Sequence, residues 1–341
     1  MGIAVQTSCS SIGLVHDSNE FRAVQLQRGG WGERVLATAI FPRMIGGCGL
    51  ELSEDELRWV GSMLARRGFV GNRLSLLPAS KWCSSHILEL PPVDDIKAKQ
   101  QVARVEVARE RKCDLNSFGI GLWDLPAKGR TRETMAVSCD RSPLDEALDQ
   151  LAAVGFDPLA IDLPEQTVVR ASLDQENSIG IAGYLHIGWD SSLAVIANDG
   201  VVVYIRRVAH GLGDVHTQIK EQYGLDQAAL ARLVQRVQDE QLEDHERPVG
   251  AMWTMMTRSL VEELDVAVRY VSHAYRMAEL GSICLSGYGA THSGLIEQVD
   301  TLLGMPVSPL VPETLKISGI SSAQCALLAM PYGLAVRNDR P

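Results

Sequence analysis

The sequence lacks closely spaced cysteine pairs. Its seven cysteines are odd in number, are scattered along the chain and never form a C-x-x-C pair. Zinc sites usually draw thiolates from such pairs, and disulfide frameworks are typical of secreted chains. We therefore expect reduced thiols, a cytoplasmic protein and no metal site. The cysteines are Cys9, Cys48, Cys83, Cys113, Cys139, Cys284 and Cys325.

The sequence also lacks long apolar runs and an excess of positive charge. No stretch approaches the ~18–20 apolar residues of a membrane-spanning helix, and the N-terminus does not resemble a signal peptide. We expect any membrane association to come through a partner. The formal charge of −10 argues against a general nucleic-acid binder. A length of 341 residues, with 46% hydrophobic and 22% charged residues, suits a folded chain of two domains.

The most informative stretch runs from Gly183 to Gly213. It predicts three strands joined by tight turns, because aliphatic residues flank a Gly-Trp-Asp-Ser turn and the hairpin signal Asn-Asp-Gly at 198–200. The third strand ends in Gly211-Leu-Gly213, and a helix is expected from Leu212. Strands at 12–15, 21–26 and 35–41 form a similar set, so the two sets amount to a weak internal repeat.

The remaining pattern predicts an alternation of helices and strands. Residues 82–160 have a β-α-β-β-α order, with a charged helix at 93–112, which indicates a compact inserted subdomain. Ser53 is expected to cap the helix at 53–67, with Glu56 completing a capping box. Other helices are expected at 212–221, 226–242, 249–275, 293–303 and 321–330, the last followed by a tail at 332–337, and other strands at 72–77, 282–285 and 306–310.

Four segments together resemble the PilM family of type IV pilus assembly proteins, and more distantly FtsA and the cytoplasmic part of GspL. The first two, IGLVHDSNEFRAVQL (12–26) and HIGWDSSLAVIANDGVVVYIRRVAHG (186–211), are similar to the family's two phosphate hairpins. The others are EELDVAVRY (262–270) and ICLSGYGATHSGL (283–295), the latter continued by LGMPV and YGLAVR. The resemblance covers nearly the whole chain in the right order, although no single motif is specific.

The resemblance implies an actin-like α/β fold, a ribonuclease H-like duplication with an inserted β-α-β-β-α subdomain. The first actin-like domain would comprise residues 1–81 and 160–180, joined by the C-terminal helix at 321–337. The inserted subdomain would comprise residues 82–159, and the second actin-like domain residues 181–320.

The chain departs from the family where the chemistry of hydrolysis would lie. The first loop has Val15 in place of an Asp and Asp17 in place of a glycine, and the second loop has His186 in place of an Asp. In the third loop the middle glycine is Tyr288. Mg²⁺ needs hard oxygen ligands, which Val and a neutral imidazole do not supply. We therefore expect no catalytic residues and no turnover, with ATP or ADP and Mg²⁺ as the only candidate cofactors.

Each candidate nucleotide-binding residue also has a plain structural explanation. The turn at 17–19 is either a remnant phosphate loop or a hairpin turn, and the turn is favoured. Gly287, Gly289 and Gly294 either cradle a nucleotide or serve a strand-to-helix turn, and the residues alone do not separate the two. Glu263 either reaches a nucleotide sugar or forms helix-surface ion pairs. The candidates are Asp17, Ser18, Asn19, Gly188, Asp190, Ser191, Glu263, Gly287 and Gly289, and His186 is interpreted as a polar residue of an altered loop rather than a metal ligand.

The resemblance also implies partners. In the family, a groove between the first domain and the inserted subdomain binds the N-terminal cytoplasmic peptide of the membrane protein PilN. The matching positions here are Leu76, Pro78, Trp82, Leu88 and Leu90. Pilus motor ATPases and self-association are further candidates, and nucleic acid is not.

The function expected from the sequence is a non-catalytic cytoplasmic scaffold of a type IV pilus or type II secretion-like assembly platform at the inner membrane. One alternative is an active actin-like ATPase or sugar kinase, against which Val15 and His186 argue. Another is an FtsA-like filament protein, which would carry a C-terminal amphipathic membrane helix, whereas this sequence stops four residues past YGLAVR.

Overall fold

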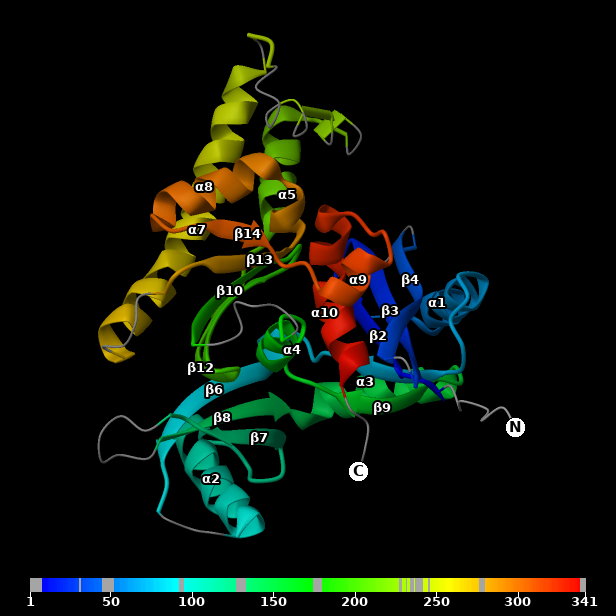
Figure 1. The fold of residues 1–341 in the computed structure, drawn as a ribbon, viewed down its shortest axis with the longest axis vertical. Coiled ribbons are helices and arrows are strands. Elements are labelled where there is room, and N and C mark those ends of the chain that lie inside the picture. The colour runs from blue at the N-terminus through cyan, green and yellow to red at the C-terminus, as the bar shows by residue number, and fades with distance from the viewer. Residues whose placement is uncertain are drawn as a thin grey trace.

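The computed structural model describes residues 8–337 except 31, 45–51, 92–94, 127–132, 174–179, 227–228, 231, 234–235, 237–241, 245 and 276–279. It has three parts, each built on its own sheet (Figure 1). We call them lobe I, lobe II and the subdomain. Within the described ranges, no helix combines the length and apolar character that crossing a bilayer requires.

Lobe I is a six-stranded mixed sheet in the order β1-β3-β2-β5-β9. The strands β1 and β2 pair with different parts of one edge of β3, and β4 pairs with its opposite edge. Apolar residues of α1 and α3 cover one face of it, packing against strand residues such as Leu14 and Phe21. The strands are β1 (Ser8–Cys9), β2 (Ile12–His16), β3 (Glu20–Gly29), β4 (Gly32–Pro42), β5 (Arg73–Leu76) and β9 (Asp157–Ile161), and the helices α1 (Glu54–Arg66) and α3 (Arg141–Ala153).

Lobe II is a five-stranded sheet in the order β12-β11-β10-β13-β14. The helices α5, α7 and α8 pack on one face of it around Trp253 and Leu285. The strands are β10 (Ile181–Ile187), β11 (Ser192–Asn198), β12 (Val201–Val208), β13 (Ile283–Gly287) and β14 (Val307–Pro309), and the helices α5 (Leu212–Tyr223), α7 (Arg247–Tyr275) and α8 (Ser293–Leu303). Lobe I contains the matching order β4-β3-β2-β5-β9, again with two antiparallel and two parallel pairings, so the internal repeat is confirmed.

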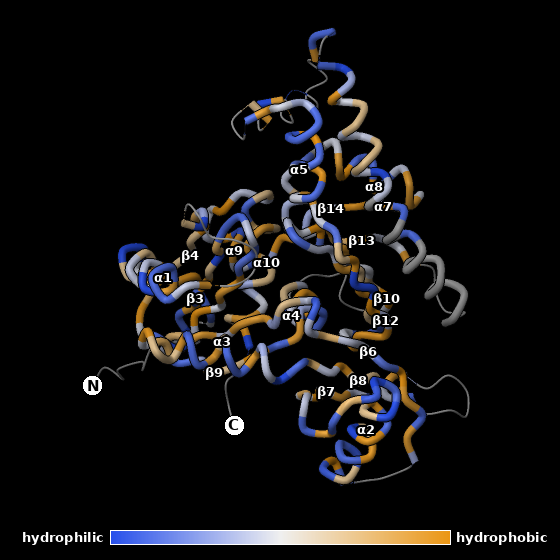
Figure 2. Tube along the Cα trace, turned by 180° about the vertical axis from the view of Figure 1, so that it is seen from behind, coloured by the Kyte–Doolittle hydropathy of each residue, from blue (hydrophilic) through white to orange (hydrophobic). Residues whose placement is uncertain are grey.

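The subdomain is an antiparallel sheet, β6-β8-β7, with α2 on one face. Its other face lies on lobe II, where Met135 and Val137 pack against Ile196 and Val203. The Trp123 indole N–H also donates to the Val202 carbonyl over 2.7 Å. The elements are β6 (Cys83–Glu89), α2 (Ile96–Arg111), β7 (Phe118–Asp124) and β8 (Glu133–Asp140). Figure 2 shows hydrophobic residues concentrated along the strands and hydrophilic residues along much of α2.

Two helices fill the space between the lobes, α4 (Pro164–Arg170) and α10 (Ser322–Val336). Their apolar residues belong to one buried cluster that includes Val24 of lobe I and Tyr184 of lobe II. The helix α10 is buried on nearly all sides from Cys325 to Ala335. The lobes therefore share a continuous core rather than an open hinge.

Three details differ from the sequence-based expectations. The last helix runs past the end expected at Met330, through Pro331 to Val336, and so approaches the longer range 321–337 that the resemblance implies; burial of the whole segment between two sheets outweighs the hydrogen bond that proline cannot make. Ser53 caps α1 as expected, with its hydroxyl accepting from the Glu56 N–H over 3.2 Å. The Glu56 carboxylate, however, does not return to Ser53; it forms two hydrogen bonds with Arg43, of 2.7 and 2.8 Å.

The third difference is β9, which was not predicted, and which pairs in parallel with β5. The expected helix at 226–242 lies largely outside the described residues, although Asp226 accepts a hydrogen bond from the Ala229 N–H over 2.7 Å. The division of the chain into domains by residue number stays a prediction.

Candidate functional site

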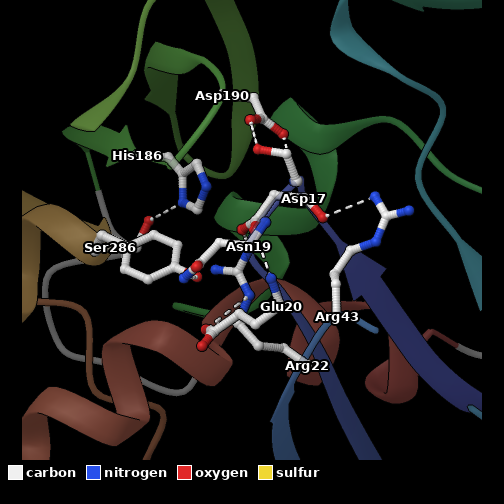
Figure 3. Close-up of polar contacts among 10 residues, drawn as sticks. Asp17, Asn19, Glu20, Arg22, Arg43, His186, Asp190 and Ser286 are labelled. Carbon is white, nitrogen blue, oxygen red and sulfur yellow. Dashed lines mark hydrogen bonds and ion pairs between the residues drawn. The ribbon is translucent and has the colours of Figure 1, made fainter. Parts of the chain in front are cut away.

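Three turns meet where lobe I faces lobe II, and Figure 3 shows Asp190 and His186 opposite Asp17, Asn19 and Arg22. The first turn, between β2 and β3, is held by its own side chain. The Asp17 carboxylate accepts from the N–H groups of Asn19 and Glu20 over 2.9 and 3.0 Å, and it pairs with the Arg22 guanidinium. Arg22 is only 2% exposed, so this is a buried ion pair inside one hairpin. The geometry supports the hairpin-turn interpretation of residues 17–19.

The second turn, between β10 and β11, bonds directly to the first. The Gly188 N–H donates to the Ser191 carbonyl over 3.0 Å, and a Cβ at Gly188 would lie 2.5 Å from that oxygen. Asp190 points across the interface, where its carboxylate accepts from the Ser18 N–H over 2.7 Å and also from the Ser18 hydroxyl. Ser18 and Asp190 thus link the two lobes.

The third turn, after β13, has glycines because β10 lies too close for side chains. Gly287 has a φ of 77°, and a Cβ there would lie 2.5 Å from the Ile187 carbonyl oxygen. A Cβ at Gly289 would lie 2.7 Å from the Ile187 Cβ. No atom of the described residues lies within 4 Å of the corresponding point at Gly294. The fold therefore requires the glycines at 287 and 289 whether or not a ligand binds there.

Tyr288 occupies the space among the three turns. Its ring is 5.1 Å from the Arg22 guanidinium carbon and 5.2 Å from the Trp189 ring, and its hydroxyl accepts from the Asn19 amide over 3.0 Å. Burial raises the pKa of the Tyr288 hydroxyl, so it is neutral at pH 7. A bulky neutral side chain from lobe II therefore packs on a buried cation of lobe I.

His186 is held by its neighbours rather than aimed at an open site. Its Nδ1 lies 3.0 Å from the Ser286 hydroxyl, and burial together with the Arg22 charge lowers the pKa of His186 to about 3. The imidazole is neutral at pH 7, in line with a polar residue of an altered loop. Among residues whose side chains are described, no group of three His, Cys, Asp or Glu is arranged to hold a metal ion.

These contacts do not suit a magnesium nucleotide. The carboxylates of Asp17 and Asp190 are both engaged in hydrogen bonds within the protein. Phosphates entering between the turns would have to separate Ser18 from Asp190 and displace Tyr288. The Glu263 side chain lies outside the described residues, but its neighbour Glu262 forms a helix-surface ion pair with Arg258, 2.9 Å long.

A second buried ion pair, between lobe II and α4, was not predicted from the sequence. Arg207 of β12 donates to the Glu165 carboxylate of α4 over 2.7 Å, and Glu165 is fully buried. Burial raises the pKa of Glu165, while the Arg207 charge opposes this shift. Arg22 was missed as well, and its only sequence signal is a cation near the start of the predicted strand at 21–26, between Phe21 and Ala23.

The residues expected to line a partner groove are separated by the structure. Leu76 is 8% exposed in the core of lobe I, and Leu88 is 9% exposed under α2 in the core of the subdomain. Pro78 is buried as well, while Trp82 and Leu90 are half-buried. Of the five, only Trp82 and Leu90 are thus within reach of a partner in this conformation, and the groove itself stays a prediction.

No protein-family model matches the sequence, and a comparison with curated proteins finds no match either. The fold, in contrast, has a close counterpart among solved structures. A structure described as a PilM-PilN type IV pilus biogenesis complex superimposes with a TM-score of 0.81 at 16% identity, over 97% of this chain and 99% of that one. The chain has the PilM fold.

Two further solved structures match with lower scores. The ethanolamine utilization protein EutJ from Carboxydothermus hydrogenoformans matches with a TM-score of 0.53 at 10% identity, over 96% of this chain and 89% of that one. A structure of Ta0583, an archaeal actin homolog, in complex with ADP has a TM-score of 0.45 at 12% identity, over 96% of this chain and 97% of that one. The PilM fold of this chain thus confirms the sequence-based recognition and the fold class.

Proposed function

We propose that this chain is a non-catalytic scaffold of a type IV pilus or type II secretion-like assembly platform at the inner membrane, where it docks on the N-terminal peptide of a PilN-like membrane protein. The PilM fold supports the choice of system, because that solved structure is a complex of PilM with PilN. The proposal that the protein is not catalytic rests on the hydrogen bonds that join the three turns across the lobes, from Ser18 to Asp190 and from Asn19 to Tyr288.

Catalysis would need the three turns to be separated by a bound metal and nucleotide rather than hydrogen-bonded to one another. Phosphoryl transfer depends on a bound metal, free oxygen ligands and a positioned water between the loops. Here Asp190 is bonded to Ser18, and Asn19 is bonded to Tyr288. The core through α10 and α4 also joins the lobes, whereas a nucleotide cycle of opening and closing would have to break it. The alternative, an active ATPase or sugar kinase, is disfavoured for these reasons.

The docking surface that we propose lies at the entry to the subdomain. In the described part of the chain β6 pairs only with β8, which leaves its outer edge open to an added strand. Ile87 on this strand is 47% exposed, and Trp82 lies just before it in a half-buried position. An extended peptide could bond to the strand edge and place apolar side chains against these two residues.

Binding of the N-terminal peptide of the PilN-like protein from the same genome tests this assignment. We expect the fluorescently labelled peptide to bind the full chain, and Trp82→Ala and Ile87→Asp each to weaken binding at least tenfold, about 1.4 kcal/mol. Ile87→Asp changes an exposed residue, so it leaves the fold intact.

The matched control is Ile317→Ala, because Ile317 is a 77% exposed apolar residue on α9 (Glu313–Ile317). This variant should bind like the wild type. The absence of peptide binding by the wild-type chain would overturn the proposed partner. Equal affinities of all three variants would overturn the proposed surface.

A further inference from the structure

Two cysteines face each other at the neck of the subdomain, by which we mean the start of β6 and the end of β8, where the chain enters and leaves the subdomain. Cys83 is the first residue of β6 and lies directly opposite Cys139 of β8 in the antiparallel register. Opposed residues in such a pair have Cα atoms about 4.5–5.5 Å apart, which is within the range that a disulfide spans. The two thiols also interact, since each shifts the pKa of the other. The backbone thus already has the spacing for a cross-strand bond.

The position of the pair gives such a bond a structural consequence. The chain enters the subdomain at Cys83, directly after Trp82, and leaves it after Asp140, where α3 begins and returns to the core of lobe I. A bond between the two cysteines would therefore tie the entering strand to the leaving strand. Cys83 also packs against the cluster that holds the subdomain on lobe II.

The surroundings of the pair distinguish the two thiols. Interaction with Cys139 and burial raise the pKa of the Cys83 thiol, whereas interaction with Cys83 and the nearby Arg111 and Arg207 charges lower the pKa of the Cys139 thiol. A cation near a thiol favours the reactive thiolate. Cys83 is half-buried and Cys139 is 8% exposed, so a small oxidant is better suited than a bulky one.

We propose that Cys83 and Cys139 form a reversible, peroxide-sensitive disulfide that staples the neck of the subdomain. A thiolate attacks one oxygen of hydrogen peroxide, which forms a sulfenic acid and releases hydroxide. The second thiol then attacks the sulfenic sulfur, forming the disulfide and releasing water. In total, two thiols are oxidised and one peroxide is reduced to two waters. A dithiol reductant reverses the step.

Peroxide treatment of the reduced full chain, followed by alkylation and non-reducing peptide mass spectrometry, tests the proposal. We expect the loss of two alkylatable thiols, a linked peptide pair that contains residues 83 and 139, and recovery of both thiols with dithiothreitol. The contrary result would be that both cysteines remain alkylatable at a dose that oxidises the exposed Cys9, or that the bond joins another pair.

Matched variants identify the pair. Cys83→Ser and Cys139→Ser should each abolish the cross-link, while Cys113→Ser should keep it, because Cys113 is a partly buried cysteine of the same subdomain outside the pair. Circular dichroism checks that the serine variants fold. If either variant does not fold, the cross-links found in the wild-type chain decide the question. The absence of a cross-link between residues 83 and 139 in that chain would overturn the proposal.

Discussion

Lowering the pH from 7 to 5 is expected to reduce the free energy of unfolding by up to about 2 kcal/mol for each of three enclosed histidines. Burial lowers the pKa values of His216 and His292 to about 4 and, with the Arg22 charge, that of His186 to about 3. The unfolded chain takes up protons on these residues as the pH falls through 6.5, and the folded chain does not. Stability is therefore highest above pH 6.5 and decreases towards pH 4.

Two carboxylic acids act in the opposite direction. Burial raises the pKa values of Glu20 and Glu165, so the folded chain gains protons on them as the pH falls towards their range. The three histidines outnumber the two carboxylic acids, so we expect a net loss of stability between pH 7 and 5. Urea unfolding at pH 7, 6 and 5 measures the net effect.

A single substitution separates the contributions of the histidines. The rings of Trp189 and Trp253 lie 4.8 and 5.4 Å from His216, whose buried Nδ1 has no hydrogen-bond partner among the described residues. His216→Phe should therefore fold normally and remove about a third of the pH dependence. A wild-type stability that is constant or rises towards pH 5 would contradict this account.

Gly333→Ala is expected to reduce the free energy of unfolding by about 3 kcal/mol. The site lies in α10 where it crosses α4, and a Cβ there would be 2.2 Å from the Thr167 carbonyl oxygen. Two backbones meet at this point, so no side-chain rotation relieves the contact. The helix would have to shift within the core shared by both lobes.

Gly294→Ala is the matched control, because Gly294 also lies in a helix, α8, but a Cβ there would meet no atom of the described residues within 4 Å. This variant should be neutral or stabilise the protein by about 0.5–1 kcal/mol. Thermal and urea unfolding of both variants give the comparison. Equal stability of the two variants would show that the crossing of α10 and α4 is not closely packed.

The sequence predicts the fold wherever the local signal and the tertiary structure agree. The hairpin at 198–200 is such a case, since Asp199 and Gly200 take the left-handed conformation (φ of 49° and 77°) that Asn-Asp-Gly favours. In β9 the signal fails, because Asp157-Pro158 suggests a break and only pairing with distant β5 makes the segment a strand. Pro331 suggests a helix end for the same local reason, and burial overrides it.

The candidate site shows the same division between local and distant information. The sequence places the three turns correctly, because glycines and turn residues mark them. It does not show that Ser18 bonds to Asp190, since these residues are far apart in the chain and neither has an unusual neighbourhood. Nor does it reveal the role of Tyr288, which in sequence is only a missing glycine but in the structure contacts Arg22 and Asn19 of the other lobe.

Thermal unfolding with increasing Mg·ATP tests most directly the claim that the three turns bond to one another instead of to a nucleotide. A ligand that binds only the folded state stabilises it by mass action, by about 2.7 kcal/mol at a hundred times its dissociation constant. The account predicts no change in the melting temperature up to millimolar Mg·ATP or Mg·ADP. A clear rise that grows with the nucleotide concentration would contradict it.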